Sequence, residues 1–598
     1  MKTCADNFPT PEQKAVIDSN SRITVVRACP GSGKTRVFVE SLKMRIDSWT
    51  KKNAGIASIS FTNVAQEQIA EGIGKHLPYP HFIGTLDAFA LRYVVRPFGH
   101  LVGLPKEGHR LIPSPLDEAI EYPEVEIDSS GQKISLFSIR FADGPLHKPN
   151  MKAKTFRGQI DIEPDYTSNI LKKKKAEWRK RGRITHSDCQ YISSLILCHP
   201  EFGKKVSELV TRRFPMILVD EFQDTNWFLG LALIELLRSP FLESGLVVGD
   251  PDQAIFEFGG ANPDLFKDIE NLPGAKSLPL NQTHRCPKKI AAIATALSDT
   301  GKQVLPRDNA DQGSAIILVH DMEKIDRNKK VIANISKFCE EEDQLAIISR
   351  RELTLRTFLG ESISSFRGVS HSGKNIENAV QMLRSDQSKV ASHIVERELA
   401  WILFKNDSPS MNDLRDLDVD LIKWRRIIYQ ILKEASIDKK DETWNEWLLR
   451  IRKLILDSAL DLNCEFDKRR ISDNLKQNLK GNVLRKMAEH LESSDSLIER
   501  ATIKTIHQVK GDEFECVVIL VPKPSPNNSP CPSVEWWPDG PSEERRVAFV
   551  AASRAKKTLI LCIHRDTYNA LRTLRSDFVD NFEQIFLFER QHSLMEFL

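Results

Sequence analysis

The feature that most constrains this chain is a glycine-rich segment near its start, Ala28-Cys29-Pro30-Gly31-Ser32-Gly33-Lys34-Thr35. It follows a β-branched run at 23–26 and precedes a segment at 37–46 whose apolar residues recur at helical spacing. Such glycines let successive backbone N–H groups surround phosphates at a helix N-terminus, where the helix dipole favours negative charge. In this setting Lys34 reaches the β- and γ-phosphates and the Thr35 hydroxyl binds Mg²⁺. The segment therefore predicts a nucleoside triphosphate site, and the alternative is a chance glycine-rich turn.

Length and composition place the chain among multidomain globular proteins. Its 598 residues are too many for one hydrophobic core, and 41% hydrophobic and 28% charged residues are ordinary values. No apolar run of about 18 residues is present to span a membrane, and no leader pattern is found at the start. The ten cysteines include no CxxC pair, so we expect reduced thiols and a cytoplasmic protein. A net charge of +3 does not by itself indicate nucleic acid.

A second apolar strand, predicted at 216–219, ends in a pair of carboxylates. Downstream of a phosphate loop, Asp220 can hold Mg²⁺ while Glu221 orients and deprotonates the attacking water. The chain turns at the end of a strand, so both side chains can face the same site. The alternative interpretation is an acidic turn that caps the next helix.

A third strand, predicted at 245–248, leads to a polar and then an aromatic segment. Gln253 can hydrogen-bond to a γ-phosphate or to the attacking water. Phe256 and Phe258 follow on a glycine-rich loop that includes Gly259 and Gly260. These rings are either a hydrophobic plug or a platform on which bases stack, at about 1–3 kcal/mol per base. The residues alone leave both interpretations open.

These segments and several others resemble the ordered motifs of one family. In the first half the matching segments are Phe8-Pro9-Thr10-Pro11-Glu12-Gln13, Ser60-Phe61-Thr62-Asn63-Val64-Ala65, Gly84-Thr85-Leu86-Asp87-Ala88-Phe89, Val219-Asp220-Glu221-Phe222-Gln223-Asp224-Thr225-Asn226, Val248-Gly249-Asp250-Pro251-Asp252-Gln253-Ala254-Ile255-Phe256 and Leu280-Asn281-Gln282-Thr283-His284-Arg285. In the second half they are 502–514, which contains Lys510-Gly511-Asp512-Glu513-Phe514, and 543–556, which contains Glu543-Glu544-Arg545-Arg546 and Ser553-Arg554-Ala555-Lys556. The chain thereby resembles the UvrD/Rep/PcrA helicases of superfamily 1 over about 1–95, 205–360 and 500–598.

The resemblance implies an α/β fold with two RecA-like P-loop cores, parallel sheets flanked by helices, each interrupted by a mainly helical accessory insert. The implied first core is 1–95 with 205–285, and its insert is 96–204. The implied second core is 286–360 with 500–598, and its insert is 361–499. It further implies ATP and Mg²⁺ as ligands, and an ATP-dependent DNA helicase or single-strand translocase moving 3′→5′.

The resemblance also assigns residues to an ATP site. The implied catalytic residues are Lys34, Glu221, Gln253, Arg285 and Arg554. The implied nucleotide-binding residues are Gln13, Ala28, Gly31, Ser32, Gly33, Lys34, Thr35, Arg36, His284 and Glu513, with Thr35 and Asp220 on the metal. The two arginines would come from the second core and grip phosphate with planar, bidentate guanidinium groups. For either arginine the alternative is a structural ion pair.

Single-stranded DNA and duplex junctions are the implied macromolecular ligands. The residues that match the family's DNA track are Phe61, Thr62, Asn63, Thr85, Asp87, Phe256 and Phe258 in the first core and Thr505 and His507 in the second. Four positions of these motifs depart from the family pattern: Asp512 stands in place of a leucine, His284 in place of a tyrosine, Asp87 in place of a histidine, and Gly259 in place of an arginine. The last two predict weaker or differently placed DNA contacts.

Each insert contains one conspicuous pattern. Residues 171–183 are a basic run with an embedded Trp178, which we interpret either as a grip on duplex backbone or as a solvated face. Residues 421–455 carry apolar stripes at helical spacing, which are typical of a helical core.

A narrower resemblance points to anti-phage defence. A short second insert, Phe82-Ile83-Gly84-Thr85 and Arg96-Pro97-Phe98 are similar to the helicase subunit of the Gabija system, which implies a nuclease partner. The alternatives are a DNA- and nucleotide-sensing regulatory ATPase that unwinds little, and a housekeeping DNA repair helicase. A built-in nuclease is disfavoured because no carboxylate–lysine cluster follows Arg565.

Overall fold

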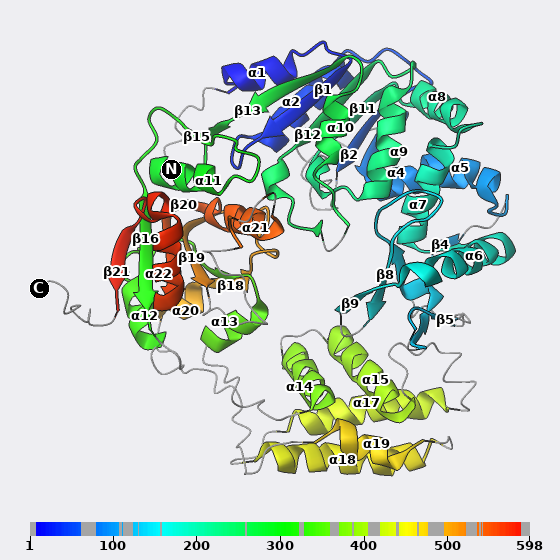
Figure 1. Cartoon of the computed structure of the whole chain (residues 1–598), viewed down its shortest axis with the longest axis vertical. Coiled ribbons are helices and arrows are strands. Elements are labelled where there is room, and N and C mark those ends of the chain that lie inside the picture. The colour runs from blue at the N-terminus through cyan, green and yellow to red at the C-terminus, as the bar shows by residue number, and fades with distance from the viewer. Residues whose placement is uncertain are drawn as a thin grey trace, which may run out of the picture. The chain divides into compact units, whose positions relative to one another are not determined.

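The computed structural model describes most of the chain (Figure 1). The described residues are 8–60, 79–106, 110–111, 124–129, 131–155, 158–257, 260–321, 328–358, 370–384, 388–404, 419–437, 442–462, 466–476, 496–521, 535–537, 540 and 542–587. Clustering of contacts divides the chain into two compact units. The motor unit is residues 1–102, 189–360 and 493–598, and the accessory unit is residues 103–188 and 361–492.

The motor unit contains a first six-stranded parallel sheet in the order β13-β1-β12-β11-β2-β3. Its strands are β1 (Ile23–Ala28), β2 (Ile56–Ser60), β3 (Phe82–Thr85), β11 (Met216–Val219), β12 (Ser244–Gly249) and β13 (Ala275–Leu280). The accompanying helices are α1 (Pro11–Ile17), α2 (Lys34–Asp47), α4 (Leu86–Ala90), α5 (Arg96–Phe98), α7 (His186–Leu197), α8 (Gly203–Arg213), α9 (Trp227–Arg238) and α10 (Leu265–Glu270). Strands β1, β2, β11 and β12 are almost wholly buried, as expected of parallel strands covered on both faces.

A second six-stranded parallel sheet has the order β18-β17-β19-β20-β16-β21. Its strands are β16 (Ser314–His320), β17 (Leu345–Ser349), β18 (Thr502–Thr505), β19 (Phe514–Val521), β20 (Ala555–His564) and β21 (Glu583–Phe586). Its helices are α11 (Lys288–Leu297), α12 (Asn328–Ile335), α13 (Glu352–Phe358), α20 (Ser496–Arg500), α21 (Glu543–Ala552), α22 (Arg565–Leu574) and α23 (Ser576–Val579). A short ribbon of β14 (Gln282–Thr283) and β15 (Leu305–Pro306) flanks α11 in the sequence. The expected fold of two parallel α/β cores is thereby confirmed; the domain boundaries given above stay predictions.

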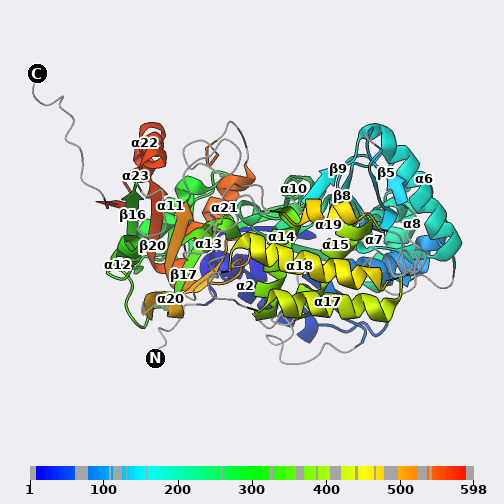
Figure 2. The same ribbon diagram turned by 90° about the horizontal axis from the view of Figure 1, so that it is seen from below.

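The second insert is helical, as its apolar stripes predict. Its helices are α14 (His371–Arg384), α15 (Ser388–Phe404), α17 (Leu421–Ala435), α18 (Trp444–Leu460) and α19 (Lys468–Asn474). Helices α17 and α18 run side by side (Figure 2), and their inward faces share one core that includes Trp424, Trp444 and Trp447. None of the helices in the described ranges is both long and apolar enough to cross a bilayer.

The first insert (96–204) contains short strands beside its helices, and the expectation of a mainly helical insert did not include these strands. Its described part holds the long helix α6 (Pro164–Arg181) beside β4 (Arg110–Leu111), β5 (Glu124–Glu126), β6 (Lys133–Ser135), β7 (Ile139–Phe141), β8 (Met151–Thr155), β9 (Gly158–Asp161) and β10 (Arg183–Ile184). Strands β5–β6 and β7–β8–β9 pair antiparallel. The strands are short and alternate polar with apolar residues, a pattern that is easily missed beside a strongly charged helix.

The basic run of the first insert forms part of α6. Trp178 is buried and therefore cannot stack on a nucleic-acid base. Lys174 is also buried, and its Nζ lies 2.7 Å from Oδ1 of Asp188 in an ion pair. The exposed cations of the run are Lys172, Lys173, Arg179, Lys180 and Arg181. The structure thus divides the run into packing residues and a solvated basic face, and a DNA contact by that face stays a prediction.

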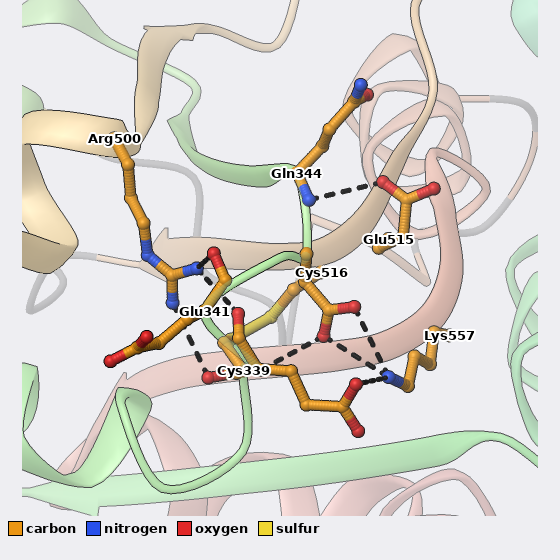
Figure 3. Close-up of a disulfide and its surroundings, with 9 residues drawn as sticks. Cys339, Glu341, Gln344, Arg500, Glu515, Cys516 and Lys557 are labelled. Carbon is orange, nitrogen blue, oxygen red and sulfur yellow. Dashed lines mark hydrogen bonds and ion pairs between the residues drawn. A yellow bond between two sulfur atoms is a disulfide. The ribbon is translucent and has the colours of Figure 1, made fainter.

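The expectation that all cysteines are reduced is wrong for one pair. Cys339 and Cys516 form a disulfide with their Cα atoms 6.2 Å apart (Figure 3). Cys516 lies in β19 and Cys339 follows α12, close to the start of the neighbouring strand β17, so strand pairing brings the two together. Their separation of 177 residues gave no sequence signal. Within the described residues, Cys29, Cys189, Cys198, Cys286 and Cys562 are free.

The helical core of the accessory unit yields a stability prediction. Ile451 on α18 is fully buried in this core, whereas Leu449 on the same helix is 48% exposed. We expect Ile451→Ala to lower the free energy of unfolding by about 2–5 kcal/mol, because it removes buried methyl groups and leaves a cavity. Leu449→Ala should change it by less than about 0.5 kcal/mol. Urea unfolding followed by tryptophan fluorescence measures both, and equal losses would contradict the packing described.

Candidate active site

The phosphate loop connects β1 to α2 at the carboxyl edge of the first sheet. Gly31 and Gly33 have φ angles of 71° and 79°, a left-handed backbone that favours glycine. Helix α2 begins at Lys34 with Gly33 as its N-cap, and no side chain caps its free N–H groups. Gln13 Nε2 donates to the Ser32 carbonyl at 3.0 Å and so fixes the loop from α1. The loop therefore presents backbone donors suited to an anion.

The predicted pair of carboxylates lies beside this loop at the end of β11. Lys34 Nζ is 3.4 Å from Oε2 of Glu221, and the Glu221 N–H donates to Oδ1 of Asp220 at 2.9 Å. Glu221 has a φ of 51°, so the chain turns there and both carboxyl groups can serve one site, as expected. The alternative of a helix-capping acidic turn does not account for the contact with Lys34.

The two carboxyl groups differ in their ease of ionisation. Burial, and then the charge of Glu221, raise the pKa of Asp220. Burial also opposes ionisation of Glu221, but Lys34, Lys510 and a hydrogen bond from Gln223 outweigh it and lower the pKa of Glu221. Glu221 is thus ionised at neutral pH, the state that a base needs.

The third strand-end segment adds Gln253 in a defined orientation. Its Nε2 donates to Oδ2 of Asp250 at 2.6 Å, and its Oε1 accepts from Nη2 of Arg554 at 3.4 Å. The Asp250 N–H in turn donates to Oε1 of Gln223 at 2.9 Å, and Gln223 Nε2 donates to Glu221. A continuous set of hydrogen bonds therefore runs from Glu221, after β11, to an arginine of the second core.

Arg554 follows the end of α21 and precedes β20, so it lies in the turn between them. Its side chain is buried, with Nε donating to the Val550 carbonyl at 3.0 Å and Nη1 to the Asp512 carbonyl at 3.2 Å. Burial, and then the charge of Arg285, lower the pKa of Arg554 to about 9, which leaves it charged at neutral pH.

Arg285 approaches the phosphate loop directly. A Cβ added at Gly31 would lie 2.5 Å from the Arg285 Cβ, so only glycine fits where the two segments meet. Arg285 Nε donates to Oε2 of Glu513 at 2.8 Å and its Nη1 donates to the Ser553 carbonyl at 3.3 Å. Both predicted arginines are therefore brought to the edge that carries the loop.

The predicted base-binding residues are held near one another. The His284 N–H donates to the Gly31 carbonyl at 2.8 Å, which places this residue over the loop. Arg36, in the first turn of α2, has its guanidinium carbon 3.8 Å from the ring centre of Phe8. Gln13 and Thr10 form a capping box at the start of α1, so Gln13 is fixed by both of its amide atoms.

The residues present fit magnesium and a nucleotide together. A hydroxyl from Thr35, half-buried in the first turn of α2, and a carboxylate from Asp220 are oxygen donors of the kind that Mg²⁺ takes in proteins, along with phosphates and water. Among the described residues no cluster of three or more His, Cys, Asp or Glu side chains forms a metal cage. This donor set suits a metal that arrives with the phosphates. The roles of these residues stay predictions.

Three cations at the contact between the cores were not among our candidates. Lys510 Nζ lies 2.7 Å from both carboxylate oxygens of Asp224 and donates to the Gln253 carbonyl at 2.7 Å. Arg546 Nε donates to the Ala254 carbonyl at 2.9 Å. Both residues lie inside matched motifs, so their charge within those motifs was the available signal. The third, Lys302, lies outside every motif and gave none.

Part of the expected DNA track is brought together across the cores. Phe256 and His507 have ring centres 6.0 Å apart, and Lys510 Nζ lies 4.8 Å from the Phe256 ring centre. Burial, and then the charge of Arg350, lower the pKa of His507 to about 4, so it is neutral at neutral pH. Thr505 ends β18 and donates through its N–H and Oγ1 to Gln508 Oε1.

The remaining track residues are placed separately or lie outside the described residues. Thr85 Oγ1 accepts from the Ala88 N–H at 3.2 Å as the N-cap of α4. Asp87 Oδ1 accepts from Gln190 Nε2 at 2.7 Å, so this unusual acid has a structural partner. Phe61, Thr62, Asn63 and Phe258 lie outside the described residues.

Comparison with known proteins agrees with this geometry. The sequence model of the UvrD/REP helicase N-terminal domain matches residues 9–273, and that of the UvrD-like helicase C-terminal domain matches residues 373–566. The chain is 24% identical to the ATP-dependent DNA helicase Rep of Buchnera aphidicola, over 92% of each protein. It is 21% identical to the ATP-dependent DNA helicase PcrA of Staphylococcus aureus NCTC 8325, over 99% of this chain and 87% of PcrA. With DNA helicase II of Escherichia coli K12 it shares 25% identity over 57% of this chain and 47% of that protein. Since the N-terminal and C-terminal domain models of the UvrD-like helicases match successive parts of the chain, the protein belongs to the UvrD-like helicase family.

Proposed function

We propose that this protein is an ATP-dependent DNA helicase that translocates 3′→5′ on single-stranded DNA. The observation that carries the proposal is the hydrogen bond from Arg554 of the second core to Gln253 of the first, at 3.4 Å. It joins the edge that holds the phosphate loop to a cation from the other core. The names of the Rep and PcrA relatives, both ATP-dependent DNA helicases, support the same activity.

The site residues divide the work of phosphoryl transfer among them. Lys34 and the N–H groups at the start of α2 bind the phosphates, and Glu221 accepts the proton of the attacking water. Arg285 and Arg554 stabilise the charge that develops on the transferred group, a role worth about 10³–10⁵ in rate for an arginine finger. Thr35 and Asp220 would hold Mg²⁺, which would supply Lewis acidity to the phosphate oxygens when bound.

Movement along DNA follows from the use of two cores for one site. Because Arg554 and the loop lie on different cores, Arg554 reaches the phosphates only when the cores are together, and loss of the γ-phosphate weakens that attraction. Phe256 and His507, one from each core, present rings near the contact between the cores. Stacking on such rings requires no particular base, so we expect little sequence preference. The 3′→5′ direction rests on the family resemblance.

The narrower assignment to anti-phage defence with a nuclease partner draws no support from packing. Phe82, which contributed to that resemblance, packs against Phe89, Tyr93 and Phe214 with ring centres 5.4, 5.5 and 6.4 Å away. Its place is explained by the core of the first sheet. We therefore propose only the ATP-dependent helicase activity. A nuclease is added in one condition of the assay described below.

Strand displacement tests the proposal. We expect the protein with ATP and Mg²⁺ to separate a duplex with a 3′ single-stranded tail, and to leave a 5′-tailed duplex intact. Lys34→Ala serves as the control without turnover, because the loop then lacks its phosphate cation. ATP hydrolysis stimulated by DNA but without displacement would favour the regulatory ATPase instead, and so would displacement that requires an added nuclease.

Glu221→Gln tests the assignment of the base. The amide keeps the shape of the side chain but cannot accept a proton, so we expect ATP to bind with a Kd within about threefold of wild type while kcat falls at least about 100-fold. Fluorescent-nucleotide titration and phosphate release measure the two quantities. A variant that neither binds nor hydrolyses ATP would contradict the role of Glu221 as base.

Arg554→Ala tests the contribution of the second core. We expect kcat with DNA present to fall at least about tenfold, because the variant lacks a buried cation beside Gln253. Arg565→Ala, an exposed arginine at the start of α22, is the matched control and should retain kcat within about twofold. An unchanged rate in Arg554→Ala would remove this residue from the site.

A further inference from the structure

We infer that Lys302 is a positioning residue for ATP hydrolysis, which holds Gln253 and the base of the phosphate loop in their working orientation from the second core. This inference rests on the proposed function and assigns a residue that lies in no recognised motif. Its basis is a buried set of contacts in the motor unit between the segment after α11 and the ends of β1 and β12.

The ammonium group of Lys302 contacts two strand ends of the first sheet. Its Nζ donates to the carbonyl of Ala28 at 2.6 Å. Ala28 is the last residue of β1, directly before the phosphate loop. It also donates to Oδ1 of Asp250, directly after β12, and lies 3.7 Å from Oδ2 of Asp252. The Lys302 side chain is 9% exposed and both carboxylates are fully buried. One cation therefore joins two strands of the nucleotide-binding edge.

The contact with Asp250 determines how Gln253 is turned. One oxygen of Asp250 receives Lys302 and the other receives Nε2 of Gln253 at 2.6 Å. With its NH₂ group engaged there, Gln253 presents its carbonyl oxygen to Arg554. If Lys302 is removed, Asp250 becomes a buried carboxylate without its cation and draws donors or water from its surroundings. The amide of Gln253 then loses its fixed orientation.

Lys302 follows α11 of the second core, so its contacts link the two cores. Helix α11 packs with α21, and its apolar face belongs to the core beneath the second sheet. The turn that follows α11 is held on Asp252, which accepts from Ser298 Oγ at 2.7 Å and from the N–H and Oγ1 of Thr300, each at 2.9 Å. Through Asp250, Lys302 thus links the second core to Gln253, the residue proposed to contact the γ-phosphate.

A purely structural ion pair predicts a different outcome from a positioning role. Loss of a structural pair lowers stability and the amount of active protein, and so reduces every activity alike. Loss of a positioning contact lowers kcat while nucleotide still binds, and the loss depends on Gln253 being present. The experiment therefore measures kcat, KM and their dependence on Gln253 in the full chain.

Lys302→Met is the test variant, with DNA-stimulated ATP hydrolysis as the assay. We expect kcat to fall at least about tenfold while KM for ATP stays within about threefold of wild type. Lys302→Arg should recover at least about a third of the rate, since it restores a donor cation. Added to Gln253→Ala, Lys302→Met should cause less than about a twofold further loss, because both changes disable the same contact.

Lys289→Met, an exposed lysine on α11, is the matched control and should leave kcat unchanged. If Lys302→Met does not fold, Lys302→Gln, which is neutral but still donates, replaces it under the same criteria. A wild-type kcat in the neutral variant, or a further tenfold loss on top of Gln253→Ala, overturns the inference. Wild-type protein that does not hydrolyse ATP with DNA refutes the proposed function instead.

Discussion

Parallel pairing of β1 with β12, and of β12 with β11, is the constraint on which the site depends. The register aligns Val26 with Val248 and Val219 with Val247, so the three strands end at one edge. The chain leaves that edge as the phosphate loop, as the Asp220–Glu221 turn and as the Asp250 turn. Apolar burial of the strands fixes the register, because a shift by one residue would expose their β-branched side chains. Segments about two hundred residues apart in the chain thus meet at this edge, where Lys34 contacts Glu221 and the Asp250 N–H donates to Gln223.

Ion pairs between buried charged groups also join the two cores. The first core ends β11 and β12 in several buried carboxylates, of which its own Lys34 contacts Glu221. Lys510 and Lys302 of the second core provide the cations, at Asp224 and at Asp250. A buried carboxylate whose partner is removed is costly, often by about 3–5 kcal/mol. The cores therefore fit each other by charge as well as by shape, and water or ligand groups must replace these cations if the cores part.

Features that depend on neighbouring residues could be predicted from the sequence. Features that depend on contacts between distant segments could not. The loop at 28–35, the pair at Asp220 and the strand before each could be recognised because neighbouring residues carry the signal. The role of Lys302 could not be predicted from the sequence. Its position depends on the turn after α11, which is hydrogen-bonded to Asp252 of the other core. The pairing of Cys339 with Cys516 likewise depends on the order of strands β17 and β19. The short strands of the first insert, with alternating polar and apolar residues, were not predicted because the charged run of α6 dominates the sequence pattern there.

The backbone at Glu221 carries a consequence for how this site evolves. Its φ of 51° is unfavourable for a residue with a Cβ, by about 1–2 kcal/mol. Glycine would relieve that strain, but it would remove the carboxylate that we propose as the base. The position is therefore subject to a stability–activity trade-off, in which the fold tolerates a locally unfavourable conformation because the reaction requires that side chain. Lineages that abandon hydrolysis and keep only nucleotide binding would be free to relax it.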